Sequence, residues 1–263
     1  MTLYTLGNVT YRYQRVTALD SLSLAIEAGT RVALLGANGS GKSTLLRILD
    51  ALFFPESGQI EFRGEPLTEA RFADEEFARA FRRRVGLVFQ NPDVQLFNPT
   101  VFDEVAFGPL QLQWPRSAIR ERVSQTLDTL RIRHLEDRVP QRLSGGEKKK
   151  VALASVLVMD PEVLLLDEPA AGLDPRSRSQ IIDRLVGWGG GVKSVIIATQ
   201  ELGDLGDIAD RCLVLQAGQL AADRPPAELL QDRELLDRTN LIHAHRHRHA
   251  SGDVHSHAHL HRP

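Results

Sequence analysis

The sequence has a single cysteine, Cys212, among its 263 residues. One thiol cannot form an intramolecular disulfide or a cysteine-based zinc site, so neither stabilises the fold, and a reducing compartment is expected. A chain of this length buries enough surface to fold without such crosslinks. Its longest apolar run, 151–159, is far shorter than the roughly 20 residues that a membrane helix needs, and its first residues lack a secretory signal pattern. The sequence therefore predicts a globular protein that does not itself span a bilayer.

An excess of charge of either sign is also absent. The 32 Lys and Arg residues nearly balance the 34 Asp and Glu residues, which gives a formal net charge of -2. Such a balance provides no extended basic field of the kind that binds nucleic acids or lipid headgroups. We therefore expect no nucleic-acid partner, and ligands must be recognised by local motifs.

Strand-like and helical segments alternate along most of the chain. Continuous apolar runs at 163–166 and 194–198 are typical of central strands in a parallel sheet, which are covered on both faces. Apolar residues within 118–135 recur at helical spacing. The pattern predicts one α/β domain over 1–242, with a core formed by 1–90 and 157–225, a helical insert at 91–156, and a helix within 226–242, followed by a histidine-rich tail at 243–263.

A glycine-rich loop follows an apolar strand predicted at 32–35. Residues 36–44 read GANGSGKST, which matches G-x-x-x-x-G-K-[ST] between a strand and a helix. Glycines let consecutive backbone N–H groups face one anion, and the helix adds the positive end of its dipole. We expect Lys42 to reach the β- and γ-phosphates and Ser43 to bind Mg²⁺. The residues predicted to bind nucleotide here are Gly36, Asn38, Gly39, Ser40, Gly41, Lys42, Ser43 and Thr44.

Two adjacent carboxylates, Asp167 and Glu168, end the apolar strand at 163–166. Ligands of open α/β sheets bind at this edge. Adjacent residues on a strand point in opposite directions, so we expect Asp167 to orient the Mg²⁺ ligands and Glu168 to polarise the attacking water. A surface pair that merely caps the strand is the alternative.

Residues 143–147 read LSGGE and precede the acidic strand. This order of motifs resembles the ATP-binding-cassette family from about residue 3 to residue 230. The resemblance implies a phosphate-loop, RecA-like core with a mainly parallel sheet, an N-terminal antiparallel β subdomain and an inserted α-helical subdomain. It also implies an ATPase that uses ATP and Mg²⁺.

The same resemblance implies roles for individual residues. Gln90 would contribute to the Mg²⁺ site and link it to a transmembrane partner, and Asp174 would belong to a dimer-contact loop. Tyr13 would stack on adenine, with Tyr11 as the competing candidate. The signature residues, expected at a helix that starts near Glu147, would bind the ATP held by a second subunit, which predicts a homodimer with two ATP sites. These residues are Ser144, Gly145, Gly146 and Glu147.

Residues 85–97 and 103–109 carry a narrower resemblance. They are similar to the ATPase subunits of energy-coupling-factor importers, which take up vitamins and transition-metal ions. This implies two membrane partners, a transmembrane coupling subunit and a metal-specific subunit, and a peripheral location on the cytoplasmic face of the cell membrane. Without the resemblance, the apolar residues here would be interpreted as a packed loop.

The sequence departs from the cassette pattern in two places, at position 200 and at 148–150. Where the family places a histidine that contacts the γ-phosphate and the attacking water, this chain has Gln200. An amide can donate a hydrogen bond but cannot exchange protons as imidazole does. The prediction is slower hydrolysis, a larger share of the work for Glu168, or an altered form that favours the ATP-bound dimer. Three lysines at 148–150 are interpreted as a solvated helix start or a phosphate-proximal patch.

Eight of the nine histidines lie in the tail, in two groups with histidine at every second position. On an extended chain this alternation puts imidazoles on one side, and imidazole binds Ni²⁺, Co²⁺, Cu²⁺ and Zn²⁺. We expect a tail without fixed structure that binds several such metals; a purification tag and an incidental polar tail are the alternatives. The histidines are His243, His245, His247, His249, His255, His257, His259 and His261.

The tail and the narrower resemblance together predict the ATP-hydrolysing subunit of a transition-metal importer, with cobalt favoured and nickel next. Three alternatives are a vitamin importer of the same type, a nucleotide-dependent soluble metallochaperone, and a cassette protein of DNA repair or translation. The LSGGE signature argues against the metallochaperone, because phosphate-loop GTPases of that kind lack it.

Overall fold

The computed structural model describes residues 1–188, 193–248 and 254–260. The strands are β1 (Thr2–Tyr13), β2 (Val16–Glu27), β3 (Arg31–Leu35), β4 (Ser57–Phe62), β5 (Glu65–Pro66), β6 (Val85–Val88), β7 (Val163–Asp167), β8 (Ser194–Thr199), β9 (Arg211–Gln216), β10 (Gln219–Arg224), β11 (Ile242–Arg248) and β12 (Val254–Leu260). The helices are α1 (Lys42–Leu49), α2 (Glu69–Phe72), α3 (Glu75–Arg84), α4 (Val101–Gln111), α5 (Arg116–Thr129), α6 (Gly145–Leu157), α7 (Pro175–Trp188), α8 (Leu205–Ile208), α9 (Pro226–Gln231) and α10 (Arg233–Arg238). Single turns of 3-10 helix occur at η1 (Pro92–Val94), η2 (Arg133–Leu135) and η3 (Pro140–Arg142).

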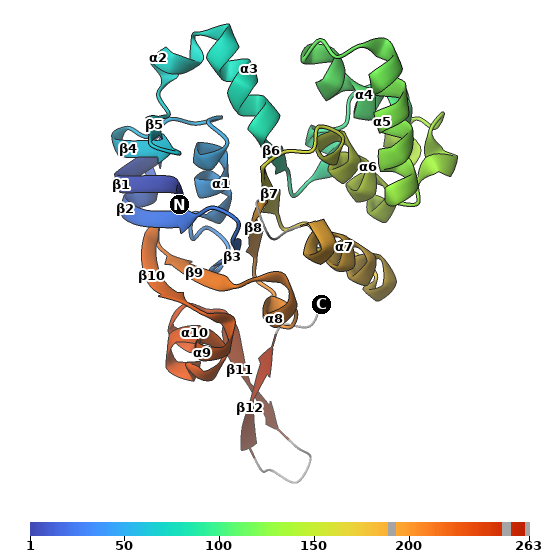
Figure 1. The fold of residues 1–263 in the computed structure, drawn as a ribbon. Coiled ribbons are helices and arrows are strands. Elements are labelled where there is room, and N and C mark those ends of the chain that lie inside the picture. Colours follow the sequence, from blue (N-terminus) through green and yellow to red (C-terminus); the bar gives the residue numbers. More distant parts are fainter. Residues whose placement is uncertain (189–192, 249–253, 261–263) are drawn as a thin grey trace.

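A six-stranded sheet forms the centre of the molecule (Figure 1). Its order is β10-β9-β3-β8-β7-β6; the last five strands run parallel, and β10 is antiparallel to β9 at the edge. Every residue of β7 and β8 is buried. Strands covered on both faces need apolar side chains at consecutive positions, which explains the continuous runs in the sequence. The predicted fold class, with its mainly parallel sheet, is confirmed.

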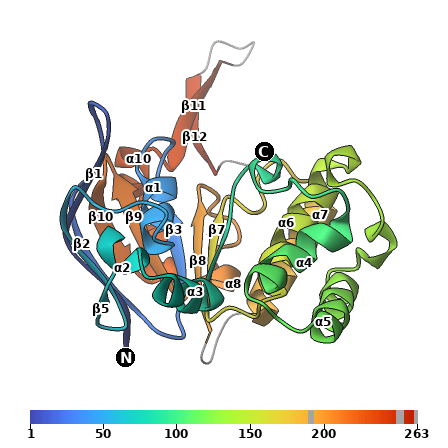
Figure 2. The ribbon, with the colours of Figure 1, turned by 90° about the horizontal axis from the view of Figure 1, so that it is seen from above.

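Alternate side chains of the central strands pack into two hydrophobic cores. In β3, Val32 and Leu34 join the core that contains α1 and the antiparallel strands, whereas Ala33 and Leu35 join the core that contains the helical insert. This division follows from the period of two along a strand. Figure 2 shows the result, with the antiparallel sheet and α1 on one side of the central strands and α4 to α7 on the other.

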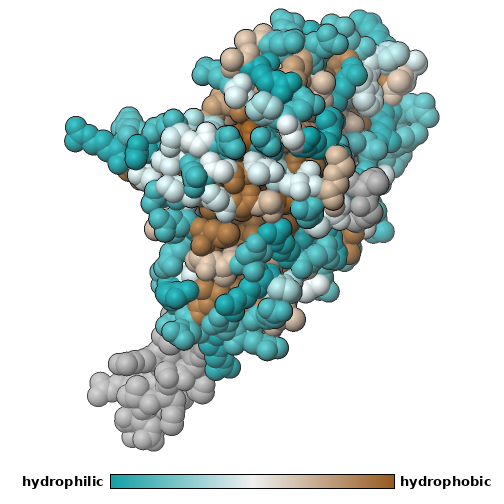
Figure 3. Space-filling model, turned by 60° about the vertical axis from the view of Figure 1, so that its left-hand side comes forward, coloured by the Kyte–Doolittle hydropathy of each residue, from teal (hydrophilic) through white to brown (hydrophobic). Residues whose placement is uncertain are grey.

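A second sheet, in the order β2-β1-β4-β5, is antiparallel throughout. Along β2 the buried residues Leu22, Leu24 and Ile26 alternate with exposed ones, because only one face of this sheet is covered. In Figure 3 this side of the molecule is turned forward, and hydrophilic residues cover most of the surface around hydrophobic ones near its centre.

The helical insert consists of α4, α5 and α6, which contact one another beside the sheet (Figure 2). The helix expected within 118–135 is α5; it ends at Thr129, two residues before Arg131 takes a left-handed backbone conformation with φ 57°. The helix expected near Glu147 begins instead at Gly145, because Ser144 caps it. Over the described ranges, no helix has the length and apolar character that crossing a membrane requires.

The prediction of one C-terminal helix at 226–242 is wrong, because this segment contains two short helices, α9 and α10. Asp232, with φ -85° and ψ 77°, lies outside the helical region and separates α9 from α10. Its carboxylate accepts a hydrogen bond of 3.0 Å from the backbone N–H of Leu235 and thereby caps α10.

We predicted a tail without fixed structure. This prediction is wrong for two segments of the tail, because β11 and β12 pair as antiparallel strands. An alternation with a period of two suits a paired strand as well as an isolated extended chain. The register pairs His243 with His259, His245 with His257, and His247 with His255. His249 and His261 lie outside the described residues.

Candidate nucleotide-binding site

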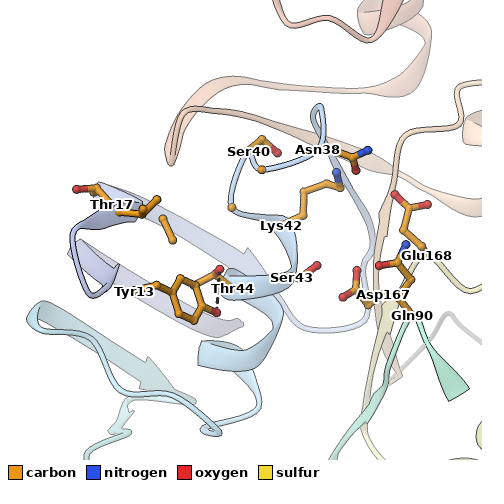
Figure 4. Close-up of a pocket in the computed structure, with 14 residues that line it drawn as sticks. Tyr13, Thr17, Asn38, Ser40, Lys42, Ser43, Thr44, Gln90, Asp167 and Glu168 are labelled. Atoms are coloured by element: carbon orange, nitrogen blue, oxygen red, sulfur yellow. Dashed lines mark hydrogen bonds between the residues drawn. The ribbon is translucent and has the colours of Figure 1, made fainter. Parts of the chain in front are cut away.

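A cavity of about 230 Å³ lies at the edge of the central sheet where β3 and β7 end (Figure 4). The strands deliver the glycine-rich loop and the acidic pair to the same place, because the carboxyl ends of parallel strands meet at one edge. The cavity is lined by Tyr13, Val16, Thr17, Ala18, Asn38, Gly39, Ser40, Gly41, Lys42, Ser43, Thr44, Gln90, Asp167 and Glu168.

The glycine-rich loop has a backbone that side chains would prevent at two positions. Gly36 has φ 148° and Gly41 has φ 108°. A Cβ on Gly36 would lie 2.4 Å from the carbonyl oxygen of Leu215, and one on Gly41 would lie 2.6 Å from that of Ala18. Only glycine fits both places. The loop can therefore bend tightly into the N-terminus of α1, where the helix dipole favours an anion.

The ammonium group of Lys42 lies across this loop. Its Nζ donates hydrogen bonds to the carbonyl oxygens of Gly36, at 2.6 Å, and Ala37, at 3.3 Å. Burial lowers the pKa of Lys42, and the carboxylates of Glu168 and Asp167 oppose that shift. A largely buried cation beside helix-end N–H groups is suited to binding phosphate oxygens.

Asp167 and Glu168 both line the cavity, which corrects the expectation that they point in opposite directions. Asp167 is the last residue of β7, but Glu168 has φ 47° and has left the strand conformation, so strand alternation no longer applies. Figure 4 shows both carboxylates on the side that faces the loop. Burial raises the pKa of Glu168 to about 7, although Lys42 lowers it. A carboxyl group with a pKa near neutrality is suited to accepting and releasing protons.

Three buried polar atoms in the cavity lining lack a hydrogen-bond partner within the described part of the chain. They are Ser40 Oγ, Asp167 Oδ1 and Glu168 Oε1. Buried polar atoms are normally paired, so unpaired ones indicate a ligand. A hydroxyl group matches a phosphate oxygen, and carboxylate oxygens match a hard cation such as Mg²⁺. The residues present therefore fit a nucleoside triphosphate with Mg²⁺.

The structure distinguishes the two candidate tyrosines. Tyr13 is 37% exposed and lines the cavity, and its hydroxyl oxygen accepts hydrogen bonds from Thr44 Oγ1 at 3.4 Å and Arg47 Nη1 at 3.3 Å. The ring of Tyr11 stacks instead on Phe53, with centroids 5.2 Å apart and an interplanar angle of 6°. Tyr11 is thus used in packing, and the Tyr13 ring is the one available to a base.

Two glutamines reach the site from other loops. Gln90 follows β6 and lines the cavity directly. Gln200 follows β8 and is not part of the lining, but its Nε2 donates a hydrogen bond to Oδ1 of Asn38 in the phosphate loop. Gln200, which stands where a histidine was expected, therefore contacts the phosphate loop through Asn38 and does not line the cavity itself.

The signature residues and Asp174 do not line the cavity. Ser144 caps α6: its backbone N–H donates to Glu147 Oε2 at 2.8 Å, and its Oγ accepts from the Glu147 N–H at 3.4 Å. Ser144 and Gly145 are exposed. Asp174 accepts hydrogen bonds from the backbone of the first turn of α7. These residues therefore lie apart from the cavity that the phosphate loop and the acidic pair form.

Sequence reasoning missed Val16, Thr17 and Ala18, which line the cavity beside Tyr13. They lie at the start of β2, and the Ala18 carbonyl oxygen closely approaches Gly41. Apart from the Thr17 hydroxyl group, their side chains have no polar or charged group that would indicate a binding site. The one available signal was their proximity to Tyr13 in the sequence.

The fold and this site define a phosphate-loop nucleoside triphosphatase. The family model described as "ABC transporter" matches residues 19–171. The chain belongs to this family, and it is an ATPase that uses ATP with Mg²⁺.

Three similar proteins refine the comparison. The chain is 53% identical over 242 residues to the nickel import ATP-binding protein NikO of Rhodobacter capsulatus, with 91% of this chain and 95% of the relative covered. It is 40% identical to the energy-coupling factor transporter ATP-binding protein EcfA of Methanothermobacter thermautotrophicus, with 90% and 75% covered. The structure of cbiO1 from Clostridium perfringens, part of the ABC transporter complex cbiONQ, has a TM-score of 0.76 and 36% identity, with 91% and 95% covered. The predicted resemblance to energy-coupling-factor ATPases is confirmed.

Proposed function

We propose that this chain is the ATP-hydrolysing subunit of a transition-metal importer of the energy-coupling-factor type. The observation that carries the proposal is the cavity in which Lys42, Asp167 and Glu168 converge while the exposed Ser144 turn lies elsewhere on the same chain. In a dimer, each chain would therefore supply the phosphate loop to one ATP site and the Ser144 turn to the other.

Within the cavity, we propose that Tyr13 stacks on the adenine ring and that the loop N–H groups and Lys42 hold the phosphates. Ser43, Gln90 and Asp167 would hold Mg²⁺, which neutralises charge on the phosphate oxygens when it is bound. Ser43 is the second residue of α1, directly after Lys42, and Gln90 and Asp167 face its hydroxyl group across the cavity (Figure 4).

Glu168 would accept a proton from the attacking water. Its position in the cavity and its pKa of about 7 support this role at neutral pH. Gln200 would contribute through the hydrogen bond that it donates to Asn38, which fixes the loop, because its amide cannot exchange protons. We therefore propose that hydrolysis depends on Glu168 and is slower than it would be with an imidazole at position 200.

Two copies of the chain would close around two ATP molecules. The N-terminal end of α6 in one copy, formed by Ser144, Gly145, Gly146 and Glu147, would contact the ATP that the other copy binds, and Asp174 would lie at the interface. The exposure of Ser144 and Gly145 supports this arrangement. Closure then depends on nucleotide, and opening depends on hydrolysis.

The partners would be a transmembrane coupling subunit and a metal-specific membrane subunit, with this chain peripheral on the cytoplasmic face. Three large exposed apolar side chains in the segment after β6 support such a contact: Val94, Phe97 and Leu110 are 68%, 62% and 50% exposed. Exposed apolar groups of this size are suited to burial against a partner helix. Val94 and Phe97 closely follow Gln90 in the sequence, which would connect that helix to the ATP site.

The imported ion would be nickel or cobalt. The sequence alone favoured cobalt, but the similarity to a nickel import ATP-binding protein, NikO, supports nickel as the first candidate. We also propose that the histidine-rich tail binds these metals, because imidazole suits them. The predicted ligands are His243, His245, His247, His249, His255, His257, His259 and His261.

Uptake of radioactive nickel and cobalt by cells that carry this chain with its membrane subunits tests the proposal. We expect uptake with the wild-type chain and none with Glu168→Gln, because the proposal makes ATP hydrolysis by this chain the energy source for uptake. Metal uptake that continues in the variant, or ATP hydrolysis without uptake of either metal, would contradict the proposed function.

A further inference from the structure

Lys149, on the signature helix α6, contacts the turn that carries Glu168. Its Nζ donates hydrogen bonds to the carbonyl oxygen of Glu168, at 3.2 Å, and to that of Ala171. Within the turn, the Ala171 N–H donates to the same Glu168 oxygen at 3.2 Å, and the Glu168 N–H donates to Ala198 at 2.9 Å. One ammonium group therefore holds both ends of the turn at 168–171.

This turn has a backbone conformation that needs support. Glu168 has φ 47°, a region that residues with a side chain occupy rarely and only where surrounding contacts hold them. The same conformation brings the Glu168 carboxylate into the cavity beside Asp167. Contacts that hold the turn thus also orient the carboxylate.

The three consecutive lysines on α6 have different partners. Lys148 Nζ lies 2.7 Å from an Asp93 carboxylate oxygen, and Lys150 Nζ donates to Gln180 Oε1 at 2.7 Å. Lys149 is the member of this group that reaches the turn. The two interpretations that the sequence allowed, a solvated helix start and a phosphate-proximal patch, did not include these hydrogen bonds to the turn.

We propose that Lys149 is a positioning residue for ATP hydrolysis, which joins the signature helix to the turn that orients Glu168. The inference rests on the proposed role of Glu168 as the proton acceptor. Ser144 caps the same helix, so α6 connects the residues proposed to contact the partner's ATP with the carboxylate proposed to act on the chain's own ATP. Closure of the dimer on one nucleotide is thereby transmitted to the other site.

The test compares variants of the full-length chain in steady-state ATP hydrolysis. Lys149→Met removes the donors and the charge, Lys149→Arg keeps both, and Lys150→Met removes the same charge from the neighbouring position of the helix. We expect Lys149→Met to lose at least about tenfold in kcat and to change KM for ATP by less than about twofold. Lys149→Arg and Lys150→Met should resemble the wild type.

Thermal unfolding and binding of a fluorescent ATP analogue show whether each variant is folded. Wild-type kcat in folded Lys149→Met, or an equal loss in Lys149→Arg or Lys150→Met, would overturn the inference. If Lys149→Met does not fold, Lys149→Gln, which keeps a donor on a shorter side chain, is measured instead: a lower kcat with an unchanged KM supports the inference, and wild-type kcat overturns it. Full activity of Glu168→Gln would instead overturn the proposed role of Glu168.

Discussion

Gln200 Nε2 donates a hydrogen bond to Asn38 Oδ1, which joins the loop after β8 to the phosphate loop. The contact occurs where the cassette family was expected to place a histidine. The hydrogen bond connects the glutamine to the phosphate loop, and under the proposed function proton exchange would depend on Glu168.

The first prediction concerns this substitution. Gln200→His should hydrolyse ATP faster than the wild type, by about tenfold, because an imidazole can exchange a proton in the reaction whereas an amide cannot. Steady-state ATP turnover of the purified chain measures the effect. Gln200→Asn, which keeps an amide but shortens the side chain, should be no faster than the wild type. A histidine variant that is also no faster would show that Gln200 does not limit the rate.

The pH dependence of hydrolysis follows from Glu168. Burial raises its pKa to about 7, so the fraction of chains with a deprotonated base grows as the pH rises through that value. The rate should therefore be half-maximal near pH 7 on the acidic side. Glu168→Gln should lose at least about a hundredfold in kcat and lose this limb, while it still binds ATP. A limb of unchanged position in Glu168→Gln would assign the titration to another group.

Adenine recognition separates the two tyrosines. Tyr13→Ala should raise KM for ATP by about tenfold, since stacking of a base on an aromatic ring contributes about 1–3 kcal/mol. Tyr13→Phe keeps the ring and should retain a normal KM. Tyr11→Ala should lower the thermal stability through lost packing on Phe53, with little effect on KM. The reverse assignment of these effects would make Tyr11 the stacking residue.

Deletion of residues 243–263 should remove binding of Ni²⁺ without changing ATP turnover. The tail holds eight of the nine histidines, and none of its described residues lines the ATP cavity. Isothermal titration with Ni²⁺ alone, on the full and shortened chains, measures the difference. A shortened chain that binds Ni²⁺ as the full chain does would remove the tail as an argument for a metal substrate.

The sequence was sufficient for the parts of the site that depend on local rules. Glycines at 36 and 41, an apolar strand before the loop and another before Asp167 each have one physical explanation, and the structure places these segments together as expected. The orientation of Glu168 could not be predicted, because its left-handed backbone depends on the turn and on Lys149.

Other features depend on contacts between distant segments. The choice between Tyr13 and Tyr11 required the position of Phe53, and the part of the cavity formed by 16–18 required the approach of β2 to the phosphate loop. The strand pairing of the tail depends on a register that alternation alone does not specify. Such information is absent from any single segment of the sequence.

The most direct test of the account is complementation between two inactive variants. Lys42→Ala removes the phosphate-binding lysine but keeps the signature, and Ser144→Arg blocks the signature but keeps the phosphate loop. Each should be nearly inactive alone. When the two are mixed, half of the sites in a mixed dimer should combine an intact loop with an intact signature, so ATP hydrolysis should reappear. Full activity of Ser144→Arg by itself, or a mixture as inactive as its components, would contradict an ATP site shared between two chains.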